Sequence, residues 1–145
     1  MEQGQYERFF ELIAAAPRLF VAGAGRSGLM GRAFAMRLMH LGRKVFVVGE
    51  TVTPAIGKGD VLLILSGSGE TGSLVRIAEQ GLAAGAAVAL ITIRPHSAIG
   101  RLAGTVLELP GVTQKSPSAE EPCITSIQPM GSMFEQSLLL LLDAT

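Results

Sequence analysis

Residues 60–71 read DVLLILSGSGET, an apolar run that ends abruptly in glycine and hydroxyl residues. The apolar part predicts a strand buried on both faces, because such strands in parallel sheets carry almost no polar side chains. An amphipathic segment, residues 71–84, follows at once and predicts a helix with an apolar stripe. A tight turn needs fewer hydroxyl groups than Ser66, Ser68 and Thr71 provide, so this turn is expected to hold a ligand.

The rest of the chain repeats this alternation of apolar strands and helices. Further strands are predicted at residues 18–22, 44–48, 86–91 and 105–109, and further helices at 4–15, 26–41, 97–103 and from about 132 to the end. The alternation predicts an α/β fold, a single three-layer domain over residues 1–145. Its doubly wound, parallel five-stranded sheet is expected in the flavodoxin-like order 2-1-3-4-5. Residues 110–129 are predicted to be irregular and are interpreted as a lid.

Composition argues against several classes of partner. Lys and Arg number 12, as do Asp and Glu, so no field of one sign favours nucleic acid or an anionic membrane surface. The single cysteine, Cys123, rules out an internal disulfide and suits a reducing compartment, so a cytoplasmic location is expected. The N-terminus shows no signal-peptide pattern, and the leucine run 138–142 is far shorter than the roughly 18 residues of a spanning helix.

The chain is apolar for its size and is expected to associate with copies of itself. Hydrophobic residues make up 48%, charged residues only 17%, and the mean hydropathy is +0.43. So few charges leave apolar surface that a homo-oligomer would bury. The expected contact surfaces are the Met-bearing helix 26–41 and the helix from Ser132.

Two glycine-rich turns are predicted to bind phosphate together. Residues 23–28, GAGRSG, follow the first strand as residues 66–71 follow the third, and in the expected order these strands are neighbours. Each turn lies at a helix N-terminus, where unpaired N–H groups and the helix dipole favour an anion. The alternative is that Ser68 and Thr71 only cap the helix. Two such turns on adjacent strands favour the phosphate interpretation.

A dinucleotide site is a sharper rival. Gly23, Gly25 and Gly28 spell GxGxxG between a strand and a helix, and Glu50 lies 22 residues further on, where it could bind a ribose hydroxyl. A second glycine-serine turn is not required by a dinucleotide and would crowd its nicotinamide. The five predicted strands also fall short of the usual six. The dinucleotide interpretation is therefore disfavoured.

These motifs together resemble a known family. VAGAGRSG, RLMHLG, VVGETVTP, LSGSGET and PMGSMFE, spread over roughly residues 5–143, resemble the sugar isomerase (SIS) domain family and, within it, the 6-phospho-3-hexuloisomerases of the ribulose monophosphate pathway. The resemblance implies a cofactor-free homotetramer that acts on a phosphorylated ketohexose. It implies Glu135 as the proton acceptor. It also implies substrate binding by Ser27, Ser66, Gly67, Ser68, Gly69, Glu70 and Thr71.

The implied reaction interconverts D-arabino-hex-3-ulose 6-phosphate and D-fructose 6-phosphate through a 2,3-enediol. One carboxylate between two carbons can move the proton, and no His, Cys and carboxylate cluster indicates a metal. Two alternatives stay open. These are another phosphosugar isomerase, such as an arabinose 5-phosphate isomerase, and a non-catalytic phosphosugar sensor. Relatives usually continue into a further helical tail, which is expected to be absent after Thr145.

Glu135 and the two histidines also have structural interpretations. Ser132 and Glu135 form an S-x-x-E capping box, but the apolar helix that follows favours a partly dry, catalytic carboxylate. His40 lies about 20 Å along its helix from Ser27, so it could serve only a neighbouring subunit's site, and a solvated or interface role is favoured. His96 follows the fourth strand, and its participation is left open.

Overall fold

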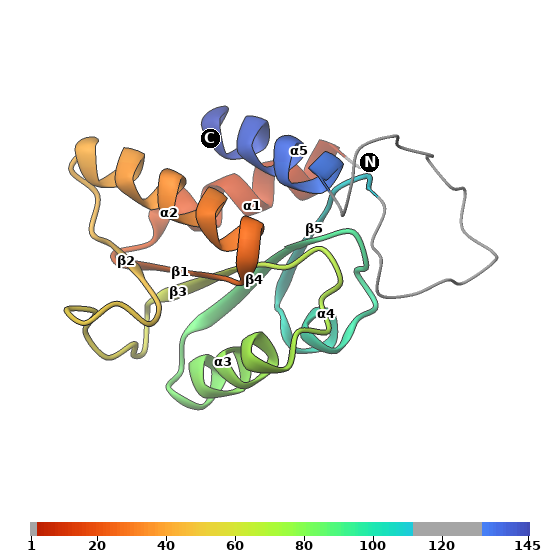
Figure 1. Cartoon of the computed structure of the whole chain (residues 1–145). Coiled ribbons are helices and arrows are strands. Elements are labelled where there is room, and N and C mark those ends of the chain that lie inside the picture. The colour runs from red at the N-terminus through yellow and green to blue at the C-terminus, as the bar shows by residue number, and fades with distance from the viewer. Residues whose placement is uncertain (1–2, 112–131) are drawn as a thin grey trace.

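The computed structural model describes residues 3–111 and 132–145, so most of the segment interpreted as a lid lies outside the described residues. The described chain contains five strands and five helices, and a helix follows every strand except β2 (Figure 1). Their bounds are α1 (Gln3–Ala15), β1 (Leu19–Gly23), α2 (Gly25–His40), β2 (Val45–Val47), β3 (Val61–Leu65), α3 (Gly72–Ala83), β4 (Ala87–Thr92), α4 (Ala98–Leu102), β5 (Thr105–Glu108) and α5 (Ser132–Asp143).

The sheet confirms the predicted fold class. Its order is β2-β1-β3-β4-β5, and all four neighbouring pairs are parallel. Each predicted element begins and ends within two residues of the observed one. This is the usual uncertainty of helix and strand boundaries. None of the described helices is long and apolar enough to cross a bilayer.

Two layers of helices cover the two faces of the sheet. Alternate residues of each strand point to opposite faces, so β3 sends Leu63 and Leu65 to one core and Leu62 and Ile64 to the other. Helices α1, α2 and α5 pack on the first face, and α3 and α4 on the second (Figure 1). Every residue of β3 is buried, which explains its wholly apolar sequence.

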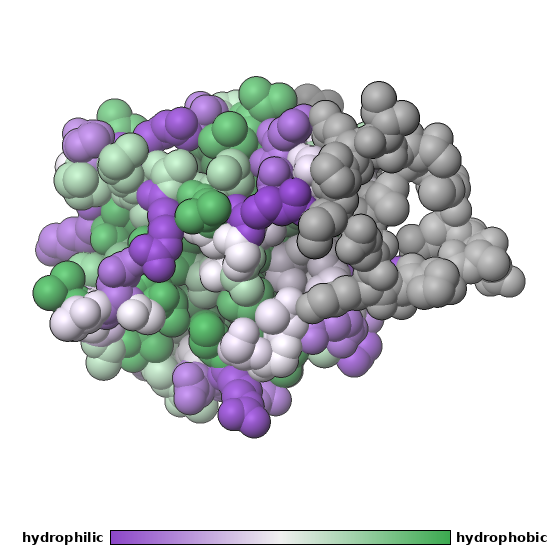
Figure 2. Space-filling model, viewed as in Figure 1, coloured by the Kyte–Doolittle hydropathy of each residue, from purple (hydrophilic) through white to green (hydrophobic). Residues whose placement is uncertain are grey.

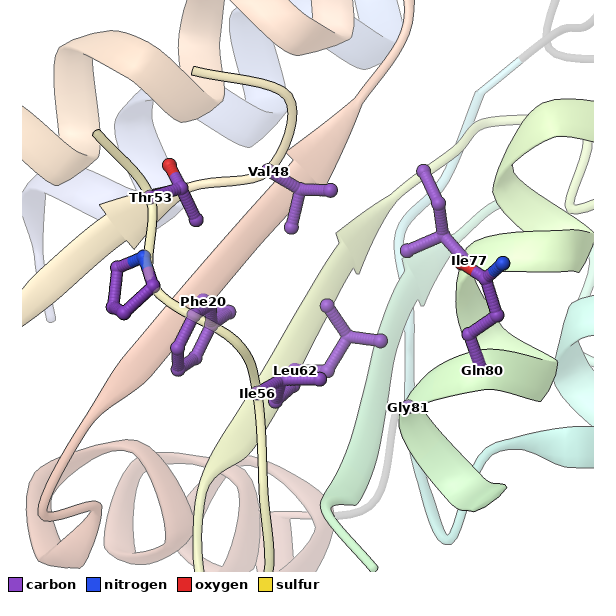
Figure 3. Close-up of a pocket in the computed structure, with 9 residues that line it drawn as sticks. Phe20, Val48, Thr53, Ile56, Leu62, Ile77, Gln80 and Gly81 are labelled. Carbon is purple, nitrogen blue, oxygen red and sulfur yellow. The ribbon is translucent and has the colours of Figure 1, made fainter. Parts of the chain in front are cut away.

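No helix connects β2 to β3, and the loop between them covers the second face of β1 and β2 only in part. The rings of Phe20 and Phe46 pack 5.2 Å apart on this face. A pocket of about 110 Å³ opens between the loop and α3. Figure 3 shows Thr53 and Ile56 of the loop opposite Ile77 of α3, with Phe20 among the lining residues.

An ion pair at the amino ends of β1 and β3 holds this loop. Nε of Arg18 donates to Oδ1 of Asp60 at 2.8 Å, and the Gly57 amide donates to Oδ2 at 2.7 Å. Asp60 is buried, whereas Arg18 is half-buried and lies over the Phe20 ring. The hydrogen bond from Arg18 holds the pKa of Asp60 below its usual value.

The two helices predicted as contact surfaces pack against each other within one chain. Phe134, Leu138 and Leu142 of α5 are buried. Large apolar side chains nevertheless stay exposed on the outer side of both helices: Leu29, Met36, Met39 and Leu140. In Figure 2, apolar residues lie among polar ones over the layer that contains α2 and α5. Self-association through this surface stays a prediction.

Candidate active site

The carboxyl ends of β1 and β3 bring the two glycine-rich turns together. Gly23, the last residue of β1, pairs in register with Leu65, the last residue of β3. The turns 23–28 and 66–71 therefore leave the same edge of the sheet side by side. Ligands of doubly wound folds bind at this edge, where the order of the strands reverses.

The first turn is shaped by a close approach of β1 to α2. A Cβ atom on Gly28 would lie 2.7 Å from the carbonyl oxygen of Gly23. Ala24 is the N-cap of α2, and no side chain caps this helix. Ser27 lies half-buried in the first turn of α2, beside these uncapped amides. The turn thus offers backbone N–H groups and a hydroxyl group to an anion.

The second turn is fixed by hydrogen bonds to β4 and α4. The carbonyl oxygen of Gly67 accepts from the Ile93 amide and from the Thr92 hydroxyl, both at 3.1 Å. The carbonyl oxygen of Gly69 accepts from the Ile99 amide at 3.0 Å. The backbone of this turn is therefore rigid without a ligand, which lowers the entropy cost of binding one.

The hydroxyl groups of the second turn have different roles. Ser66 is buried, and its oxygen accepts from the Gly69 amide at 3.1 Å, so it supports the turn. Ser68 is half-buried, and its hydroxyl oxygen accepts from the Glu70 amide at 3.3 Å. Thr71 is the N-cap of α3, yet its side chain makes no capping bond. The alternative in which Ser68 and Thr71 merely cap α3 therefore finds no support in the contacts.

Glu70 faces α4 at the edge of the site. Its Oε1 accepts from the Ala98 amide at 2.8 Å, in the first turn of that short helix. Ser97 caps the same helix by accepting from the Gly100 amide. Glu70 thus ties the second turn to α4, a structural contact beside the substrate role that the resemblance implies.

The first turn of α5 places Glu135 against both glycine-rich turns. Oε2 of Glu135 lies 2.9 Å from Nε of Arg26, which belongs to the first turn. A Cβ atom on Gly67 would lie 3.3 Å from the Phe134 ring, so the residue before Glu135 packs on the second turn. The start of α5 therefore lies beside both turns, through Glu135 at the first and through Phe134 at the second.

Arg26 is the site residue that sequence reasoning missed. Its Nη1 donates to Oγ of Ser132 at 3.1 Å while its Nε faces Glu135, so it joins the first turn to α5 twice. The sequence did offer a signal for it, because Arg26 is the only charged residue of the turn GAGRSG.

The other polar candidates lie apart from this centre. His40 is the last residue of α2 and is exposed, about 20 Å from Ser27 along a helix that rises 1.5 Å per residue. His96 is exposed, and its carbonyl oxygen accepts from Arg101. Glu50, the carboxylate of the dinucleotide rival, forms an exposed ion pair with Arg32 of α2. Among the described residues, no group of three His, Cys, Asp or Glu could hold a metal ion.

Comparisons with known proteins show the family to which the chain belongs. The family model of the SIS domain matches residues 12–140. A 3-hexulose-6-phosphate isomerase of Bacillus subtilis is 46% identical over 132 residues, which are 91% of this chain and 70% of the relative. A protein of the same name from Mycobacterium gastri is 48% identical over 127 residues, 88% of this chain and 62% of the relative.

A solved structure extends the comparison to the fold. The crystal structure of a Methanococcus jannaschii protein, described as inferring a molecular function of 3-hexulose-6-phosphate isomerase, has a TM-score of 0.83 and 34% identity. The match covers 98% of this chain and 73% of that one. Because the family model matches most of the chain and the relatives agree with it in sequence and fold, this chain belongs to the SIS domain family.

Proposed function

We propose that this chain is an isomerase that interconverts D-arabino-hex-3-ulose 6-phosphate and D-fructose 6-phosphate. The observation that carries the proposal is the position of Glu135, which pairs with Arg26 of the first turn and follows Phe134, a residue packed on the second turn. Relatives that bear the name 3-hexulose-6-phosphate isomerase support the same activity.

The phosphate of the substrate is held by the two turns. Helices α2 and α3 both begin here without a side-chain cap, so their first amides can donate to an anion. The hydroxyl groups of Ser27, Ser68 and Thr71 add donors without bulk. The other residues of the proposed site, Ser66, Gly67, Gly69 and Glu70, shape the second turn through the contacts described above.

Glu135 moves the proton. In the direction from fructose 6-phosphate, the C3–H bond breaks, its proton binds to Glu135, and its electrons form the double bond of a 2,3-enediolate. The same carboxyl group then returns the proton to C2 while the hydroxyl proton on O3 moves to O2, which leaves a hydroxyl group at C2 and the ketone at C3. Because the 6-hydroxyl is esterified, the 3-keto sugar cannot close a five-membered ring through O6, so the product needs no acid to open it. The step requires no cofactor.

The assembly and location are part of the proposal. We place the protein in the cytoplasm as a homotetramer of single SIS domains spanning residues 1–145. The exposed side chains of Leu29, Met36, Met39 and Leu140 supply apolar surface that an assembly would bury.

Solvent exchange of the fructose 6-phosphate protons tests the activity. In heavy water, the native chain is expected to exchange the C3 proton, followed by proton NMR, and Glu135→Gln is expected to abolish this exchange. Glu79→Gln, on the exposed side of α3, is the matched control and should exchange like the native chain.

Each other outcome points to a different function. Exchange at C1 instead of C3 would indicate an aldose–ketose isomerase such as one acting on arabinose 5-phosphate. Tight binding without exchange would indicate a phosphosugar sensor. Full C3 exchange by Glu135→Gln would show that another residue is the base. Glu120 and Glu121, which lie outside the described residues, would then be tested first.

A further inference from the structure

We propose that Arg26 is the positioning residue of the isomerase site. Its positive charge faces the Glu135 carboxylate before proton transfer and the enediolate of the substrate after it. The inference rests on the proposed function and extends it, because that function uses Glu135 and the two turns but gives Arg26 no role. Three observations carry it: the fork of contacts that Arg26 makes, the burial of the Glu135 oxygen, and the contrast with the other ion pairs of α2.

Arg26 holds the start of α5 at two points. Its Nη1 donates to Oγ of Ser132 at 3.1 Å, and its Nε lies 2.9 Å from Oε2 of Glu135. Only a guanidinium reaches two such groups from one side chain, because its donors are spread over a rigid plane. These contacts fix the first turn of α5 relative to the turn at 23–28, on which the phosphate is proposed to bind.

The Glu135 oxygen that faces Arg26 is buried and has no hydrogen-bond donor among the described residues. This oxygen, Oε2, nevertheless lies only 2.9 Å from the guanidinium Nε. The distance gives an ion pair, while the direction of the N–H bond does not give a hydrogen bond. Arg26 thus stabilises the carboxylate by charge at its buried oxygen, while the exposed part of the Glu135 side chain is left to meet a substrate.

The two other arginine ion pairs of α2 differ from this one. Arg32 pairs with Glu50, and Arg37 pairs with Asp143 of α5, and both partners of each pair are exposed. The side chain of Glu135 is only 21% exposed, against 40% for Asp143. Surface pairs contribute little to stability, so burial of one carboxylate oxygen singles out the Arg26 pair.

Proton transfer would move the negative charge without leaving Arg26 unpaired. When the C3–H bond breaks, Glu135 becomes neutral and the enediolate oxygen of the substrate becomes negative. A fixed positive charge beside both groups stabilises the charge before and after this step, and needs no reorganisation during it. The Arg26 side chain is 41% exposed, so part of it is open to solvent beside the ion pair.

The test compares Arg26→Gln with Arg37→Gln in C3 proton exchange at saturating fructose 6-phosphate. Arg37 is the matched control because it also joins α2 to α5 through an ion pair. Arg26→Gln is expected to slow exchange about 10- to 100-fold, the scale of a misplaced catalytic group. Calorimetric titration should show that its Kd for fructose 6-phosphate changes much less, and Arg37→Gln should behave like the native chain.

One further variant separates positioning from folding, and the Kd separates positioning from phosphate binding. Arg26→Lys keeps the positive charge but loses the two-point contact of the guanidinium, so it should slow C3 exchange at least about tenfold. This variant replaces Arg26→Gln in the test if Arg26→Gln does not fold. A large rise in Kd with an unchanged saturated rate would make Arg26 a phosphate ligand and overturn the inference.

The remaining outcomes also decide. Native exchange by Arg26→Lys, or equal losses in Arg26→Gln and Arg37→Gln, would overturn the positioning role and leave the isomerase intact. Absence of C3 exchange by the native chain would overturn the proposed function and this inference with it.

Discussion

Gly69 and Ser97 lie so close together that a Cβ atom on Gly69 would fall 1.9 Å from the Ser97 hydroxyl oxygen. Gly69 also has a φ of +63°, in the left-handed region that other residues adopt only at a cost. The contact joins the second glycine-rich turn to the N-cap of α4. The second glycine of LSGSG is therefore required by packing as well as by the turn.

Gly69→Ala is expected to lower the free energy of unfolding by about 2 to 4 kcal/mol, from backbone strain and overpacking together. Urea denaturation followed by circular dichroism measures it. Gly104→Ala is the control, since a Cβ there would have a single neighbour at an ordinary 3.9 Å. Equal stability of the two variants would contradict the packing argument.

Asp60→Asn is expected to destabilise the chain near neutral pH. The hydrogen bond from Arg18 lowers the pKa of Asp60 in the folded chain, so the folded state favours the ionised form. This contribution is fully present above the pKa of an unfolded-chain aspartate and is lost as pH falls through the lower, folded pKa. Thermal unfolding from pH 7 to pH 3 should therefore show the difference between native and variant shrinking in acid.

The exposed pair of Arg37 and Asp143 gives the matched comparison for that pH series. Asp143→Asn should change the melting temperature little at any pH, because exposed ion pairs contribute little. A gap between native and Asp60→Asn that widened in acid would show that the sign of the argument is wrong.

Ser68→Ala combined with Thr71→Ala is expected to weaken fructose 6-phosphate binding by about 1 to 3 kcal/mol, from lost hydrogen bonds to a charged group. The free energy of unfolding should hardly change, because neither hydroxyl caps α3. Isothermal titration calorimetry and urea denaturation measure the two effects. An unchanged Kd would assign the hydroxyl groups another use.

Ser66→Ala should show the opposite pattern. Its oxygen accepts from the Gly69 amide in a buried place, so its loss leaves that donor unsatisfied. The expected cost is about 1 to 3 kcal/mol of unfolding free energy. This contrast between neighbouring serines tests the division of the turn into supporting and binding hydroxyl groups.

The sequence predicted those features that short-range patterns determine. A run such as 60–65 predicts a covered strand, and five such runs among helices predict a doubly wound parallel sheet, in which the observed order is the likeliest one. The glycine turns were predicted for the same reason, since they directly follow two of these strands. Periodicity could not distinguish burial within the chain from burial against a copy, so the apolar helix α5 was predicted as an interface although much of it packs on its own sheet.

Contacts between distant segments could not be predicted in this way. Arg26 and Glu135 are far apart in the sequence and share no spacing rule, so their ion pair appears only in the fold. Glu70 was read together with its turn, and its bond to the Ala98 amide depends on where the short helix α4 begins. Side-chain direction at loop positions follows from tertiary packing, which residue patterns do not encode.

The glycines of the first turn spell the GxGxxG pattern of a dinucleotide site, but close packing of α2 on β1 also explains them. A Cβ atom on Gly28 would meet backbone atoms of Gly23 at 2.7 and 3.0 Å, which cannot rotate away. Gly28→Ala should therefore force α2 away from β1 and cost about 1 to 3 kcal/mol of unfolding free energy. A Cβ on Gly25 would meet nothing within 4 Å, so Gly25→Ala should cost only the strain of its φ of +56°, about 1 to 2 kcal/mol.

Exchange kinetics separate these two glycines more sharply than stability does. Movement of α2 would displace Arg26 from Glu135, so Gly28→Ala should slow C3 exchange at temperatures where it stays folded. Gly25→Asn, whose residue type tolerates the left-handed region, should stay close to native stability. If Gly28→Ala kept native exchange while Gly25→Asn lost stability, close packing of helix on strand would not be the reason for the glycine pattern.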